Sequence, residues 1–276
     1  MKSTDLERTT KDYYNSSDAD QFYYKIWGGE DIHIGIYKDE NDSIYDASRR
    51  TIEKMASLLN GKQQGYKILD IGSGYGGAAR YLAKKFNYTI NCLNLSEQQN
   101  NRNRALNREQ GLDKAVNVID GSFEEIPFPD ETFDVVWSCD AILHSGNKKK
   151  VLKEVHRVLI NQGDFIFTDP MQSDDCPPGV LRTVLERIHL DSMGSFRFYK
   201  ETLLSLGFEE VQIIDLTNQL ITHYSKVYHE LESRYEDIVN LSSQAYIDRM
   251  KEGLNNWVEA GEKGYLAWGI LHFRKK

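Results

Sequence analysis

The sequence has little of several features that define whole classes of protein. Its 276 residues include only three cysteines, at positions 92, 139 and 176, whose wide spacing excludes a disulfide framework and a paired-cysteine metal site. Apolar runs stay well short of the roughly 18 residues that cross a bilayer, and residues 1–20 lack the apolar stretch of a secretory signal. We therefore expect a cytoplasmic protein of a reducing compartment, without a membrane partner.

Positive charge is also scarce. Lysine and arginine number 34 against 42 acidic residues, which gives a net charge of −8, and they form no long basic stripe. This excludes the electrostatic footprint of a nucleic-acid-binding protein. No cluster of His, Cys and Asp has the spacing of metal ligands, so we expect no metal.

What is present is a globular composition, with 40% hydrophobic residues, and a regular alternation of strand and helix patterns. Helical spacing is found over 44–59, 78–83, 97–110 and 147–159, and strand patterns over 66–71, 88–95, 116–120, 133–138, 164–168, 209–216 and near 264–274. Strands that alternate with helices predict right-handed βαβ units and a largely parallel sheet, hence an α/β fold.

Two segments do not fit simple alternation. Residues 170–198 are too long for a short connection, and residues 217–262 are mostly helical, so we predict that both are lids over a ligand site. We expect residues 1–64 to form an N-terminal aromatic arm and helices covering the active site. The remaining chain, 65–276, would be one domain with these helical insertions.

A glycine-rich turn follows the first predicted strand. Gly72, Gly74 and Gly77 satisfy the GxGxxG pattern, which leaves a dinucleotide site open as an interpretation. Asp70 stands two residues before the first glycine, where its charge would repel a pyrophosphate but attract a cationic ligand. The loop Asp70–Gly77 resembles motif I of the class I S-adenosylmethionine-dependent methyltransferases.

The resemblance continues in family order through about residues 65–170. It implies a Rossmann-like fold with a mixed seven-stranded sheet flanked by helices. It also implies S-adenosyl-L-methionine as cofactor, with S-adenosyl-L-homocysteine as product. The residues that it places at the cofactor are Asp70, Gly72, Ser73, Gly74, Asn94, Leu95, Gln99, Gly121, Ser122, Phe123 and Cys139.

Two of these positions depart from the family pattern. Asn94 stands where the family usually has an acid that binds the ribose hydroxyls, and it can alternatively be read as a cap of the next helix. Ser122 stands where the family usually has an Asp that meets the adenine amino group, with Asp120 nearby.

A narrower resemblance lies in the arm. Residues 22–37 look like the corresponding arm of the sarcosine/dimethylglycine N-methyltransferases, which make glycine betaine. In the related phosphoethanolamine enzymes a Tyr–His pair closes over the methyl group, and that pair falls here on Tyr23 and His144. The catalytic residues predicted in this way are Tyr23, Asp140 and His144.

The same resemblance implies a small-molecule amine substrate. Aromatic faces attract a developing quaternary ammonium, and an arginine can bind a carboxylate bidentately. We therefore expect Tyr24, Trp27, His33 and Arg197 to bind the substrate. Arg182, Arg187 and His189 are the other basic residues of the 170–200 segment, and the sequence does not decide which of them points inward.

Other functions remain open from the sequence alone. They are methylation of phosphoethanolamine derivatives, methylation of a lipid or tocopherol-type substrate, and a non-catalytic adenosylmethionine- or dinucleotide-binding module. The oligomeric state is also open, with a homodimer as one candidate.

Overall fold

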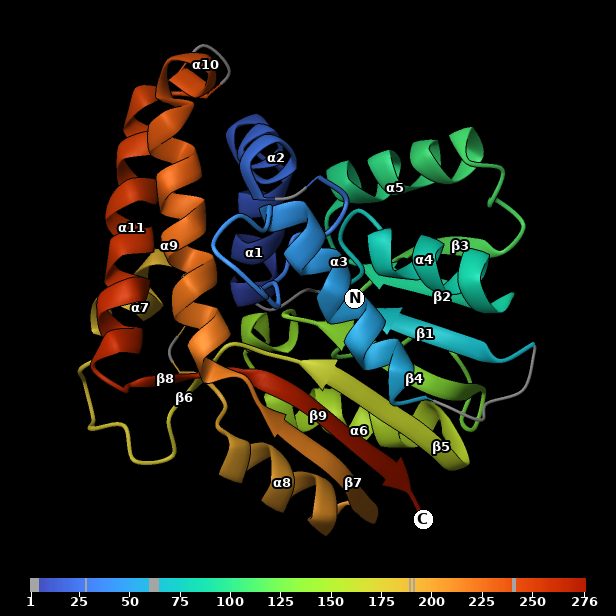
Figure 1. Ribbon diagram of the computed structural model, residues 1–276. Helices are drawn as coiled ribbons and strands as arrows, with labels where there is room; N and C mark the ends of the chain where they lie inside the picture. Colours follow the sequence, from blue (N-terminus) through green and yellow to red (C-terminus); the bar gives the residue numbers. More distant parts are fainter. Residues whose placement is uncertain (1–4, 28, 60–64, 189, 191, 240–241) are drawn as a thin grey trace.

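The computed structural model describes residues 5–27, 29–59, 65–188, 190, 192–239 and 242–276. Its centre is a sheet with the strand order β3-β2-β1-β4-β5-β9-β7 (Figure 1). The strands are β1 (Lys67–Ile71), β2 (Thr89–Asn94), β3 (Val116–Asp120), β4 (Phe133–Cys139), β5 (Leu159–Thr168), β7 (Phe208–Asp215) and β9 (Gly269–Lys275). Because β9 runs antiparallel to both β5 and β7, the sheet is mixed, and the predicted seven-stranded α/β fold is confirmed.

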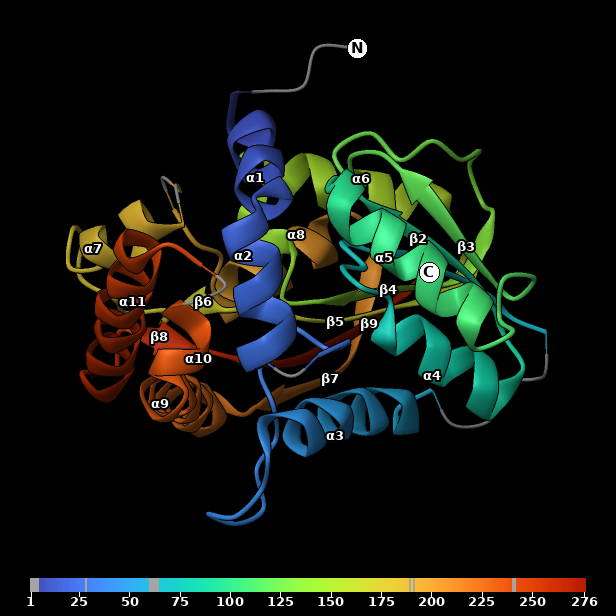
Figure 2. The ribbon, with the colours of Figure 1, turned by 90° about the horizontal axis from the view of Figure 1, so that it is seen from above.

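Helices cover both faces of this sheet. On one face lie α3 (Ile44–Ser57), α4 (Gly77–Phe86) and α5 (Glu97–Glu109), and on the other α6 (Lys148–Val158) and α8 (Phe196–Ser205). Figure 2 shows α3 and α4 on the side of β5 and β9 opposite to α6 and α8. Buried apolar side chains of α3 and α4 pack with Ile68 and Ile90, whereas those of α6 and α8 pack with Phe165 and Phe167.

Two strand predictions differ from the structure. The strand predicted to begin at Asp164 already begins at Leu159, which pairs with Phe133 before residues 160–163 leave the register. The strand predicted near 264–274 is split into β8 (Leu266–Ala267), which pairs with β6 (Met171–Gln172), and β9. At both places a local irregularity interrupts the strand, and the residues at the interruption have the sequence pattern of a turn.

The arm and the long insertions form one further layer, which we call the helical cap. It comprises α1 (Asp5–Asn15), α2 (Ser17–Phe22), the π-helical turn Tyr23–Trp27, α7 (Arg182–Arg187), α9 (Thr217–Ser233), α10 (Tyr235–Val239) and α11 (Gln244–Glu262). Side chains from the arm, α7, α9 and α11 share a single apolar core, so segments at opposite ends of the chain lie side by side (Figures 1 and 2). The helical nature predicted for 217–262 is confirmed. The boundary predicted at residue 64 falls outside the described residues and stays a prediction.

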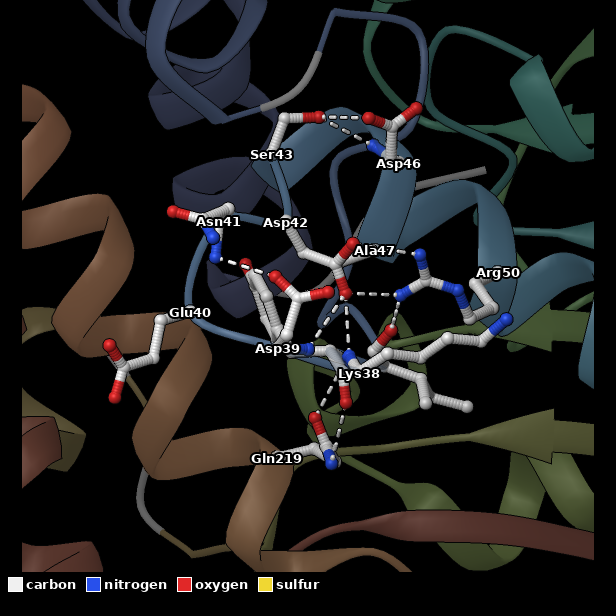
Figure 3. A network of polar contacts seen from close by, with 12 residues as sticks. Lys38, Asp39, Glu40, Asn41, Asp42, Ser43, Asp46, Ala47, Arg50 and Gln219 are labelled. Atoms are coloured by element: carbon white, nitrogen blue, oxygen red, sulfur yellow. Dashed lines mark hydrogen bonds and ion pairs between the residues drawn. The ribbon is translucent and has the colours of Figure 1, made fainter.

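The turn between the arm and α3 is fixed by Asp42. Its carboxylate accepts hydrogen bonds from the backbone N–H of Lys38 at 2.5 Å and from two nitrogens of Arg50 at 2.8 and 3.0 Å (Figure 3). The Arg50 guanidinium lowers the pKa of Asp42 to about 2. Gln219 of α9 accepts a hydrogen bond from the N–H of Tyr37 at 2.7 Å. The turn is thereby joined to both α3 and the helical cap.

No helix in the described part of the chain combines the length and the apolar character needed to cross a membrane.

Candidate active site

Two adjoining cavities lie where the sheet meets the helical cap. The loop cavity, of about 690 Å³, is bounded by the glycine-rich loop, the ends of β2 and β4, and α1. The aromatic cavity, of about 440 Å³, is bounded by the arm, α11 and the turn after β4. Their shared wall consists of Tyr14, Ile32, Asp140 and His144.

The glycine-rich loop needs glycine for conformation and for space. Gly72 has φ of +74° and Gly74 has φ of +51°, values that residues other than glycine seldom adopt. A Cβ on Gly72 would lie 2.2 Å from the Cβ of Ala141. A Cβ on Gly77 would lie 1.9 Å from Oδ1 of Asp31, which therefore packs against the first turn of α4. The loop can thus bring its backbone close to a ligand.

Beside the loop is a smaller recess that concentrates negative charge. Asp31, Asp70 and Ser73 are among its lining residues. Burial, with Asp31 nearby, raises the pKa of Asp70 to about 7, and burial also raises the pKa of Asp31. Arg49 lies 2.9 Å from Oδ2 of Asp31 and offsets part of this charge. Two buried carboxylates in one recess fit a cationic group.

The end of β2 presents an amide to the loop cavity. Asn94 Nδ2 donates a hydrogen bond to Oε1 of Gln99 at 3.0 Å, which leaves Asn94 Oδ1 as an acceptor for a hydroxyl. The alternative reading of Asn94 as a helix cap is wrong, because Ser96 caps α5 by accepting from the N–H of Gln99. Leu95, Phe123 and Cys139 line the same cavity.

Of the predicted cofactor residues, Asp70 and Ser73 line the recess instead, whereas Gly121 and Ser122 line neither the cavity nor the recess. Gly121 packs so closely on Leu93 that a Cβ would lie 2.9 Å from its Cδ1. The Ser122 hydroxyl bonds to Glu7 of α1 and accepts from the N–H of Glu124 at 3.0 Å. Ser122 therefore connects the cavity wall to the first helix, with no contact to the cavity itself.

Sequence reasoning missed the part played by α1. Glu7, Thr10, Lys11 and Tyr14 line the loop cavity. Their spacing of three and four residues places them on one helix face, and this spacing was the available signal. Lys11 also pairs with Glu97 at the start of α5 at 2.7 Å, so α1 closes the cavity against the sheet domain.

Asp140 follows β4 in a strained conformation. Its φ is +50°, uncommon for a residue with a side chain and frequent at functional sites. Its Oδ2 accepts from the N–H of Ile34 at 2.7 Å, and its Oδ1 accepts from Nε1 of Trp268 at 2.8 Å. Burial raises the pKa of Asp140. These contacts hold one carboxylate rigidly between the two cavities.

The predicted pairing of Tyr23 with His144 is replaced by another. The hydroxyl of Tyr14 lies 3.0 Å from Nε2 of His144, whereas that of Tyr23 lies 3.1 Å from the hydroxyl of Tyr13. Tyr14 and Tyr23 are neighbours, with ring centroids 5.6 Å apart. The hydrogen-bonded partner of His144 in the structure is thus Tyr14 of α1, and a catalytic role for Tyr23 stays a prediction.

The structure unites some of the predicted substrate residues and separates others. Trp27 and His33 line the aromatic cavity, together with the predicted catalytic residues Tyr23, Asp140 and His144. Two predicted substrate residues lie elsewhere. Tyr24 packs against Arg102, whose guanidinium carbon is 4.2 Å from the ring centroid. Arg197 has a side chain 56% exposed, paired at 3.5 Å with Asp175 on the surface.

His33 presents an acceptor to the aromatic cavity. Its Nδ1 lies 3.2 Å from the carbonyl oxygen of Ile34, which favours the tautomer with the proton on Nδ1. Its buried Nε2 has no hydrogen-bond partner among the described residues. His189 lies outside the described residues, as does the side chain of Arg187. Within the described ranges, no three His, Cys, Asp or Glu side chains gather as a metal site requires.

Comparisons with known proteins give a consistent result. A family model described as a methyltransferase domain matches residues 69–167. The sarcosine/dimethylglycine N-methyltransferase of Aphanothece halophytica is 53% identical over 274 residues, covering 99% of both chains. The enzyme of the same name from Halorhodospira halochloris is 53% identical, covering 97% of this chain and 96% of its own.

A solved structure agrees with these relatives. It is that of a Galdieria sulphuraria protein provisionally named as a sarcosine dimethylglycine methyltransferase, which is 43% identical. It superposes with a TM-score of 0.91 and covers 96% of this chain and 99% of its own.

Proposed function

The chain belongs to the sarcosine/dimethylglycine N-methyltransferases, and we propose that it methylates sarcosine and N,N-dimethylglycine with S-adenosylmethionine, giving glycine betaine. The observation that carries the proposal is the shared wall of the two cavities. Tyr14, Asp140 and His144 face both the loop cavity and the aromatic cavity. A group transferred between ligands in these cavities would pass these three side chains.

The loop cavity and its recess fit the cofactor. Buried Asp31 and Asp70 suit its ammonium, and Oδ1 of Asn94 suits a ribose hydroxyl. Leu95 and Phe123 offer apolar surface to an adenine ring. When bound, S-adenosylmethionine supplies an electrophilic methyl group on a sulfonium, and the carbon–sulfur electron pair stays on the thioether product when the amine nitrogen takes the methyl.

The aromatic cavity suits a small cationic amine. The Asp140 carboxylate, already oriented by Ile34 and Trp268, attracts the substrate ammonium. The Nε2 lone pair of His33 can accept a hydrogen bond from it. The rings of Tyr23 and Trp27 can stabilise the positive charge that grows on nitrogen during methylation, by about 0.5–2 kcal/mol each.

The amine must lose a proton before it can attack, since aliphatic ammonium groups stay protonated near neutral pH. We assign the transfer to Tyr14 and His144. The Tyr14 hydroxyl accepts the ammonium proton and passes its own to Nε2 of His144, 3.0 Å away. His144 is only partly buried, so its imidazolium can return the proton to solvent. Holding the amine and methyl in line supplies the rest of the acceleration.

The lining of the aromatic cavity argues against a phosphorylated substrate. Its described lining residues include no Arg or Lys, and a phosphate would be expected to have such partners. The cytoplasmic location and a homodimer both stay predictions.

A methyl-transfer screen tests the proposal. Purified protein would be given glycine, sarcosine, dimethylglycine, phosphoethanolamine or a tocopherol precursor, and S-adenosylhomocysteine would be measured. We expect turnover of sarcosine and dimethylglycine. Turnover of phosphoethanolamine without dimethylglycine would overturn the choice of substrate. Calorimetric titrations with adenosylmethionine and with NAD test the identity of the cofactor. Binding of NAD without binding of adenosylmethionine would refute the proposed cofactor.

A further inference from the structure

The four tryptophans of the chain differ in whether the indole N–H has a hydrogen-bond acceptor among the described residues: two have one and two do not. Trp137 Nε1 donates to Sγ of Cys139 at 3.2 Å, and Trp268 Nε1 donates to Oδ1 of Asp140 at 2.8 Å. Trp27 and Trp257 are 5% and 1% exposed, yet their buried Nε1 atoms have no acceptor among the described residues. Both of these tryptophans, from opposite ends of the chain, line the aromatic cavity.

A buried donor without an acceptor costs about 1–3 kcal/mol of stability. Trp27 and Trp257 are tied together by Tyr224, whose ring lies 5.7 Å from that of Trp27 and stacks on that of Trp257 at 4.7 Å. Two such donors on one cavity therefore indicate an acceptor ligand rather than an isolated packing defect.

The chemistry of the cavity identifies that ligand group. Asp140 supplies negative charge for an ammonium, and no Arg or Lys is present among the described lining residues. A zwitterionic amino acid that places its ammonium at Asp140 still needs donors for its carboxylate. Arg197, the arginine predicted for this task, is exposed and paired with Asp175.

We propose that Trp27 and Trp257 form a carboxylate subsite, in which both indole N–H groups donate to the carboxylate of the amine substrate. This inference rests on the proposed function and deepens it, because it explains how an N-methylated amino acid is chosen over an amino alcohol with the same amine. It also makes recognition depend on the arm and α11 being docked together, since each contributes one donor.

The kinetic test compares two acceptors with the same dimethylamino group, dimethylglycine and 2-(dimethylamino)ethanol. Trp27→Phe and Trp257→Phe keep an aromatic ring but remove the donor. We expect each to raise KM for dimethylglycine at least about tenfold, as for a hydrogen bond to a charged group. The fall in kcat/KM for the amino alcohol should be clearly smaller, because phenylalanine weakens only the contact of the ring with the amine, which both acceptors share. Equal losses on both acceptors would mean a merely structural role and would overturn the subsite.

Arg197→Gln and Arg182→Gln are the matched controls, because both side chains are exposed and paired with surface carboxylates, Arg197 with Asp175 and Arg182 with Glu186. Both should leave KM for dimethylglycine within about twofold. An increase in KM in either arginine variant, with no increase in the tryptophan variants, would assign the carboxylate to that arginine instead. Thermal unfolding of each variant would identify any loss of fold.

A binding measurement separates this inference from the proposed reaction. In the ¹⁵N-tryptophan-labelled protein with S-adenosylhomocysteine, the four indole N–H signals can be assigned from single Trp→Phe variants. We expect dimethylglycine, but not the amino alcohol, to move the Trp27 and Trp257 signals downfield. Turnover of dimethylglycine without these shifts would refute the subsite alone, whereas shifts without turnover would support the subsite and refute the proposed reaction.

Discussion

The hydroxyl of Tyr14 lies 3.0 Å from Nε2 of His144 and joins the first helix of the chain to the turn after β4. The two residues are 130 positions apart, and both face the two adjoining cavities. In the proposed mechanism Tyr14 takes the proton from the amine and His144 returns it to solvent, so proton removal depends on the pair.

Tyr14→Phe should therefore lower kcat for dimethylglycine by about 100-fold, the usual scale of general acid–base catalysis. Affinity for the cofactor should change much less, because the ring that lines the loop cavity is retained. Steady-state kinetics and calorimetry would measure the two effects. Tyr13→Phe is the control, since the Tyr13 hydroxyl contacts Tyr23 and Tyr246 and belongs to neither cavity wall. Equal losses of kcat in both variants would contradict a specific role for Tyr14.

Asp140→Asn should raise KM for the amine at least about tenfold, because the charge that pairs with the ammonium is lost. Asparagine tolerates a positive φ, so the backbone conformation can persist. Trp268→Phe keeps the charge and removes one donor to Asp140, and it should cause a smaller loss. Kinetics with dimethylglycine would rank the variants. A larger effect of Trp268→Phe would show that the orientation of Asp140 matters more than its charge.

Binding of the cofactor should depend on pH through Asp70. Its pKa is raised to about 7, and a bound ammonium would lower it, so binding releases a proton. Affinity should then rise with pH toward 7, by at most about tenfold per pH unit, and level off above it. Calorimetry in buffers with different ionisation enthalpies would count the released proton. The Asp70→Asn variant should bind the cofactor more weakly above pH 7, and its affinity should no longer rise between lower pH and pH 7. If the affinity of the variant rises with pH as before, Asp70 is not the source of the pH dependence.

The glycine loop can be tested with two substitutions that cause similar backbone strain. Gly72 and Gly111 have φ of +74° and +68°, so alanine at either should cost about 1–2 kcal/mol of unfolding free energy. A Cβ on Gly72 would meet Ala141 at 2.2 Å, whereas one on Gly111 has no atom within 4 Å. Gly72→Ala should thus cost about 1–3 kcal/mol more and weaken cofactor binding. Urea unfolding and calorimetry would compare them, and equal effects would contradict a steric role for Gly72.

The sequence predicted the position of a site residue well where that residue follows the end of a strand by a few positions. Asp70 and Gly72 were placed correctly at the end of β1 because a strand, a tight turn and a helix follow in direct succession. Asp140 and His144 were likewise placed by their distance from the end of β4. Arg197 was not, because nothing in a helical lid pattern shows which side chain faces inward.

The sequence by itself determined the sheet and the glycine loop, since periodicity and turn chemistry act over a few residues, and the resemblance of its motifs indicated the family. Only the tertiary structure decided which tyrosine meets His144 and which tryptophans lack an acceptor. These contacts join α1 to β4 and the arm to α11. Their geometry depends on how the helical cap packs on the sheet, and that packing leaves no local pattern in the sequence.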